Sequence, residues 1–199
     1  MRSPIPAAAV LLAATLALAG CSLGGGAEKP SGDSTGTVQE ATAPKIDAPA
    51  ATGQTISGDG YSYVVPEGWG VPEQSVPGFD PDSLAADLQD ADGFTDNVNV
   101  VKSPVGVVDA DRVESAGVKE LDAAGASEVT VNDRVTIAGS ESAHLTALMT
   151  AGGATYAIEQ YYVSTADQTY IVTFSFNDTV ASAERTALAE SVLVTWRWA

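Results

Sequence analysis

The single histidine of the chain, His144, is the residue that most invites a catalytic role. It lies in the run 142–149, and nearby acidic residues could complete a hydrolase acting on wall glycan or ester substrates. A Ser-His-carboxylate triad needs its nucleophile on a strained turn beside an oxyanion hole, and no Gly-x-Ser-x-Gly elbow surrounds His144. We therefore expect no catalytic residue, and interpret His144 as a surface or hydrogen-bonded strand histidine.

Four aspartates around Gly93 suggest a calcium loop: Asp87, Asp90, Asp92 and Asp96. In an EF-hand the glycine occupies the sixth position, which would put Leu88 first and Asn99 twelfth, so the ligand pattern fails. We interpret this stretch as a solvated acidic loop, with an irregular calcium site as the alternative. One Cys and one His also exclude thiolate zinc clusters and multi-histidine metal sites. We expect no metal and no cofactor.

Acidic residues dominate the chain, with 26 Asp and Glu against 9 Lys and Arg and a net charge of −17 over 199 residues. Such a chain is repelled by phosphate backbones, so nucleic acid is excluded as a partner. Residues 54–199 hold 22 of the acidic and 6 of the basic residues. The acidity therefore belongs to the folded domain, where it favours solubility and distance from an anionic membrane leaflet.

The N-terminus predicts export. Arg2 precedes an apolar stretch over 5–19 that is too short to span a bilayer, as in a signal peptide over residues 1–20. Leu18-Ala19-Gly20-Cys21 then resembles the bacterial lipobox. This resemblance implies cleavage before Cys21, diacylglycerol on its thiol and an acyl chain such as palmitate on its amine. Such a lipoprotein is anchored to the extracytoplasmic face of the cell membrane. The alternative is an ordinary signal peptide followed by an unrelated Cys.

Residues 21–53 follow as the lipidated Cys and a linker. Of the 32 residues over 22–53, 22 are Gly, Ser, Thr, Pro or Ala, without apolar periodicity. Such a segment cannot bury enough surface to offset its ordering entropy. We predict a disordered tether that holds the domain about 30 Å from the lipid.

Residues 54–199 predict one α+β domain. A Gly58-Asp59-Gly60 turn signal lies within a hairpin over 55–66, and a long acidic excursion over 71–96 contains at most a short helix over 81–88. Helices are predicted over 109–124, capped by Asp109, and over 180–194, capped by Asp178 or Thr179. Alternating residues predict strands over 97–102, 128–137, 141–150, 155–163 and 168–176. Short turns between consecutive strands indicate an antiparallel meander flanked by helices.

Four aromatic residues are candidates for contact with a ligand or partner: Trp69, Tyr162, Trp196 and Trp198. Trp and Tyr anchor such contacts at low entropic cost, and these residues could line a groove for an apolar or sugar-bearing ligand or a protein. The alternative is ordinary core packing.

The order of these features resembles the Mog1/PsbP-like fold. The resemblance rests on the opening 61–69, the strand at 96–100, Gln160-Tyr161-Tyr162 within the meander, and the ending Trp196-Arg197-Trp198. With the lipobox and tether, the chain is similar to actinobacterial lipoproteins of the LpqN/LpqT type. The resemblance implies an antiparallel sheet with helices on both sides and a non-catalytic binding or assembly role in envelope biogenesis. It supplies no catalytic residues.

We therefore expect a membrane-anchored, extracytoplasmic lipoprotein that is not an enzyme and acts as a monomeric binding or adaptor module. Its partners would be the membrane, through the lipid anchor, and envelope proteins or lipids. The alternatives are an envelope hydrolase that uses His144 with nearby acidic residues, and a spacer that binds nothing specific.

Overall fold

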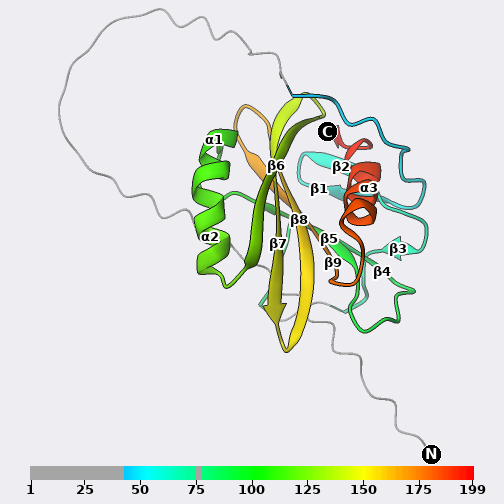
Figure 1. Ribbon diagram of the computed structural model, residues 1–199. Coiled ribbons are helices and arrows are strands. Elements are labelled where there is room, and N and C mark those ends of the chain that lie inside the picture. The colour runs from blue at the N-terminus through cyan, green and yellow to red at the C-terminus, as the bar shows by residue number, and fades with distance from the viewer. Residues whose placement is uncertain (1–42, 75–77) are drawn as a thin grey trace, which may run out of the picture.

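The computed structural model describes residues 43–74 and 78–199 (Figure 1). The predicted signal peptide, Cys21 and most of the predicted tether lie outside the described residues. The described chain is an α+β fold, as predicted, and its strands form two antiparallel sheets. Within the described ranges, no helix has the length and apolar character needed to cross a membrane.

A large antiparallel sheet forms the centre of the fold. Its four-strand meander confirms the predicted strands, each boundary lying within one residue of the prediction. In spatial order the sheet contains β3 (Trp69–Gly70), β4 (Ser83–Asp87), β5 (Asn97–Lys102), β9 (Thr169–Asn177), β8 (Ala154–Ser164), β7 (Ser140–Ala151) and β6 (Ser127–Ile137).

A small sheet packs beside the large one and contains the predicted hairpin. Its order is β1 (Thr55–Gly58), β2 (Tyr61–Val64) and β10 (Arg197–Trp198). Trp198 pairs with Tyr61, so the C-terminus of the chain closes against the start of the domain.

One helical segment covers each face of the large sheet (Figure 1). The predicted helix over 109–124 is confirmed as three consecutive pieces: α1 (Ala110–Arg112), the π-helical turn η1 (Val113–Gly117) and α2 (Val118–Ala123). Its cap is confirmed as well, because the Asp109 carboxylate accepts a hydrogen bond from the Arg112 backbone N–H at 2.7 Å. On the other face lies α3 (Ser182–Leu193), whose N-cap is Ala181, so the predicted cap at Asp178 or Thr179 is wrong.

The short helix predicted over 81–88 is also wrong, because this segment forms β4. Ser83 pairs with Val100, and the register continues to Ala86 opposite Asn97. Helix propensity is a weak preference that tertiary pairing overrides. Here β4 supplies the backbone partners of β5 and buries Ala85 and Ala86. Strand β5 is consequently covered on both faces rather than half-buried as predicted.

Residues 43–53, which the sequence assigns to the tether, form an extended N-terminal arm packed on the domain. The Thr136 N–H donates to Pro44 O at 2.8 Å, and the Thr136 hydroxyl donates to Ala43 O at 2.6 Å. Farther along, the Ala51 N–H donates to Ser191 O at 2.8 Å. Ile46 and Ala51 pack against the core. The predicted tether therefore differs from the structure over this stretch, because the domain satisfies the arm's backbone.

The core is divided by the large sheet. The helical segment α1–α2 covers one side, which includes Leu121, Leu145, Met149, Ile158 and Tyr162. Helix α3 and the small sheet cover the other, which includes Tyr61, Tyr63, Phe174, Phe176 and Trp196. This arrangement confirms the predicted sandwich with helices on both faces.

Candidate functional site

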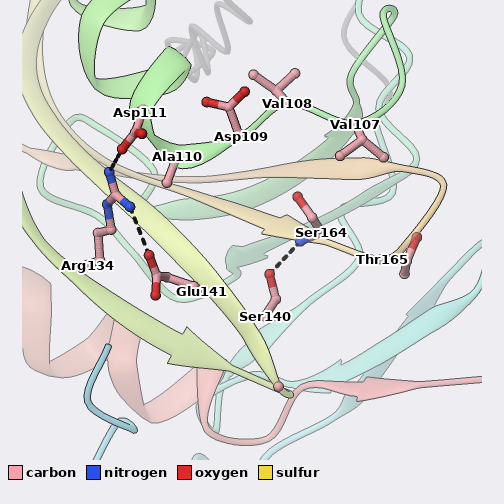
Figure 2. Close-up of a pocket in the computed structure, with 11 residues that line it drawn as sticks. Val107, Val108, Asp109, Ala110, Asp111, Arg134, Ser140, Glu141, Ser164 and Thr165 are labelled. Carbon is pink, nitrogen blue, oxygen red and sulfur yellow. Dashed lines mark hydrogen bonds and ion pairs between the residues drawn. The ribbon is translucent and has the colours of Figure 1, made fainter. Parts of the chain in front are cut away.

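A cavity of about 580 Å³ opens at one end of the large sheet, and we call it the end cavity. The β6–β7 turn, the β8–β9 turn and the start of α1 converge on it (Figure 2). Its lining consists of Val107, Val108, Asp109, Ala110, Asp111, Arg134, Gly139, Ser140, Glu141, Ser164 and Thr165.

The β6–β7 turn shapes one wall of the end cavity. Ala138 and Gly139 have φ values of 47° and 87°, as in the two-residue turns that match the twist of a hairpin. Ser140 follows, and its Oγ accepts a hydrogen bond from the Ser164 backbone N–H at 2.9 Å. This bond joins the two hairpin ends, as Figure 2 shows.

Arg134 supplies the cation of the end cavity. A register shift between Asn132 and Val135 marks a bulge in β6, and bulges commonly redirect a side chain at a strand edge. From this bulge the guanidinium reaches three carboxylates. It donates twice to Glu114, at 2.5 and 2.8 Å, once to Glu141 at 2.8 Å, and once to Asp111. These hydrogen bonds raise the pKa of Arg134 above its already high range.

The lining combines charged and hydroxyl groups with aliphatic side chains. Among the described residues that line the end cavity, none is His, Cys or aromatic. The cation is already held by carboxylates, so it is not poised to transfer a proton. Val107, which is 49% exposed, and Ala110 add an aliphatic wall.

His144 lies elsewhere, beneath α3. Its Nε2 is 2.7 Å from Glu159 Oε2, and its ring stacks on Tyr161 with centroids 4.1 Å apart. The Thr186 hydroxyl donates to the same carboxylate oxygen at 3.4 Å, and Arg185 Nε lies 3.5 Å from Glu159 Oε1. The hydrogen-bonded state is confirmed, whereas the surface position is wrong, because His144 is only 6% exposed.

The four aromatic candidates do not gather at one place. Trp196 is 1% exposed and stacks on Tyr61 at 4.4 Å, while Trp198 contacts Trp196 edge-on at 5.6 Å. Trp69 belongs to the same core cluster. Tyr162 lies on the opposite face of the sheet, where its hydroxyl donates to Gln160 Oε1 at 2.7 Å and burial raises its pKa. None of the four lines the end cavity, and their role as ligand contacts stays a prediction.

The acidic loop is organised by its own backbone. Asp87, Asp90 and Asp92 each accept a hydrogen bond from the backbone N–H two residues later. Asp96 accepts from the Asn177 N–H at 2.9 Å, and burial raises the pKa of Asp96 to about 6. Within residues 43–74 and 78–199, no group of three His, Cys, Asp or Glu residues is arranged to hold a metal ion.

Sequence reasoning missed Arg134, Asp111 and Glu141 as site residues, and it identified Asp109 only as a helix cap. One signal was present: Arg134 is one of only six basic residues in an acidic domain. Its three carboxylate partners come from α1, η1 and β7, so no local spacing identifies them.

Comparisons with known proteins establish the fold. No protein-family model matches the sequence, and no curated protein matches it either. Among solved structures, the chain is similar to LpqN of Mycobacterium tuberculosis, which is described as involved in cell envelope biogenesis. The two share 15% identity over 73% of this chain and 89% of LpqN, with a TM-score of 0.52.

The chain is also similar to the cyanobacterial PsbP of Synechocystis sp. PCC 6803. The identity is 17% over 85% of this chain and 98% of PsbP, with a TM-score of 0.50. The predicted Mog1/PsbP-like fold is therefore confirmed.

Proposed function

We propose that this chain is a lipid-anchored protein of the extracytoplasmic membrane face that acts as a non-catalytic binding or adaptor module in cell-envelope biogenesis. The lipobox ending in Cys21 supports the anchor. The fold shared with LpqN, a protein involved in cell envelope biogenesis, supports the setting. The module is a monomer whose partners are envelope proteins or lipids.

The end cavity is the observation that carries this proposal. It offers about 580 Å³, within the range of small-molecule and side-chain pockets. Its polar groups come from α1, β6, β7 and β8, and the one cation in its lining, Arg134, is neutralised by Glu114, Glu141 and Asp111. An arrangement of this kind recognises a ligand by shape and charge.

The arm supports a link between the anchor and this site. The chain enters the domain at Thr136, which follows Arg134 by two residues on β6. Gly139, three residues later, lines the end cavity. A tether that joins the domain at this point holds the end cavity close to the site of attachment.

The competing proposal is a hydrolase that uses His144. The hydrogen bond between His144 and Glu159, with the Thr186 hydroxyl at 3.4 Å from the same carboxylate, is the observation in its favour. Against it, His144 and Glu159 are 6% and 0% exposed, and neither lines the end cavity. A hydrolase would require a substrate to displace α3 before reaching His144.

Labelling with palmitate tests the anchor. The wild-type chain should incorporate label and partition with membranes, whereas Cys21→Ser should lose both properties. Label that persists in Cys21→Ser would overturn the anchoring proposal.

Two valines provide a matched test of the site. Val107 lines the end cavity and is 49% exposed, whereas Val131 is 43% exposed and lies outside its lining. The assay is a pull-down from envelope extracts with the full chain as bait. Val107→Trp should abolish recovery of the envelope ligand, and Val131→Trp should leave its recovery unchanged. Equal recovery with both variants would place ligand binding elsewhere.

A further inference from the structure

The charge of the end cavity limits the ligands that it can accept. Asp109, Asp111 and Glu141 line it against one cation, Arg134. Glu114, just outside the lining, makes a bidentate pair with that same cation. An anionic ligand would therefore meet excess negative charge and a guanidinium whose hydrogen bonds are already made.

The walls exclude a second ligand class. The apolar part of the lining is aliphatic and consists of Val107, Val108 and Ala110. No aromatic ring is present among the lining residues to stack on a nucleobase or a planar ligand. A flexible aliphatic chain fits this surface better than a flat ring does.

Arg134 demonstrates how the site holds a cation. Its aliphatic stem crosses from β6 while its guanidinium is held by carboxylates from the helical segment and β7. Asp111 also extends into solvent, because its side chain is 87% exposed. A second cation arriving from outside meets the same carboxylate group beside an aliphatic wall.

We propose that the end cavity binds a basic polypeptide segment, with a Lys or Arg head beside Asp109 and Asp111 and the aliphatic stem against Val107. This inference rests on the proposed function, and it assigns the ligand class of the same site. The net charge of −17 would steer such a segment toward the domain.

Titration of the full chain with a pentalysine peptide tests the inference, with a pentaglutamate peptide as the opposite-charge probe. Calorimetry should detect pentalysine binding that weakens from low to high salt, because exposed charges are screened. Pentaglutamate should not bind. Asp111→Asn should weaken pentalysine binding about tenfold.

Asp133→Asn is the matched control, since it removes the same charge from an exposed residue next to Arg134 and outside the lining. It should change pentalysine binding by less than about twofold. Equal weakening by Asp111→Asn and Asp133→Asn would mean diffuse attraction to an acidic surface and would overturn the inference. Binding of pentaglutamate would overturn it too.

The valine variants separate this inference from the proposed function. If pentalysine fails to bind while Val107→Trp still abolishes recovery of the envelope ligand, the basic ligand class is wrong and the site stands. If Val107→Trp has no effect in either assay, both proposals fail.

Discussion

Arg134 and Glu114 form a bidentate ion pair, with Nε 2.5 Å from Oε1 and Nη2 2.8 Å from Oε2. The pair joins the bulged part of β6 to the π-helical turn η1 and so fixes one wall of the end cavity. Bidentate geometry adds directional specificity that a point charge cannot supply. Both side chains remain about a quarter exposed, at 28% and 26%, so solvent screens the attraction.

Glu114→Gln should lower the free energy of unfolding by about 1 kcal/mol, because one of two charged hydrogen bonds is lost at a partly exposed site. Urea unfolding of the full chain measures this change. Asp133→Asn is the control, with no expected loss. Equal effects of the two substitutions would contradict the structural role of the pair.

Glu159→Gln should be far more damaging, at about 3 kcal/mol, because it leaves the Arg185 cation without its anion in a buried site. Glu159 is 0% exposed, and the Arg185 side chain is 14% exposed. Urea unfolding again provides the measurement. The control is Glu184→Gln, which changes an exposed residue next to Arg185 on α3. A hydrolase would instead lose activity at unchanged stability, and that result would refute a structural role for the His144 cluster.

Asp96 should make stability depend on pH. Its pKa is raised to about 6, first by burial and further by neighbouring aspartates. The folded state therefore holds a proton that the unfolded state has released, so this group's contribution to stability is lost as pH rises from about 4 through about 6.

Asp96→Asn should flatten this dependence and raise stability above about pH 7 by about 1 kcal/mol, a value reduced for partial exposure. The Asn177 N–H can still donate to the new amide oxygen. Unfolding measured across this pH range is the test, with exposed Asp167→Asn as control. An unchanged pH profile in Asp96→Asn would contradict the assignment.

The arm should be part of the folded unit. A Cβ added at Gly53 would lie 2.4 Å from the Pro66 carbonyl oxygen, so Gly53→Ala should cost about 2 kcal/mol. Removal of residues 1–42 should leave the melting temperature unchanged, whereas removal of residues 1–53 should lower it. Thermal unfolding of the two truncations tests this, and equal melting temperatures would mean that the arm does not stabilise the domain.

Most of the fold could be predicted from the sequence because its signals are local. The alternation over 128–176 and the cap at Asp109 are short-range patterns, and both predictions are confirmed. The segment at Ser83–Asp87 could not be predicted, since its strand state depends on pairing with β5. The arm was missed for the same reason, because its backbone partners Thr136 and Ser191 are distant in sequence.

The site could be predicted far less well. Arg134 lies 23 residues from Asp111 and 20 residues from Glu114 in the sequence. The tertiary fold brings the three side chains together, with Arg134 at the bulge in β6. The aromatic residues attracted attention by type, yet Trp196 is buried in the core. Residue type predicts burial for aromatics, whereas convergence of charges requires the tertiary structure.

Photo-crosslinking in the cell envelope tests the central claim most directly. A photoreactive amino acid placed at Val107 or at Val131 samples two valines of similar exposure, one lining the end cavity and one outside it. We predict a discrete adduct from position 107 and none from position 131. Adducts from position 131 alone, or from neither position, would contradict the account of the end cavity as the binding site.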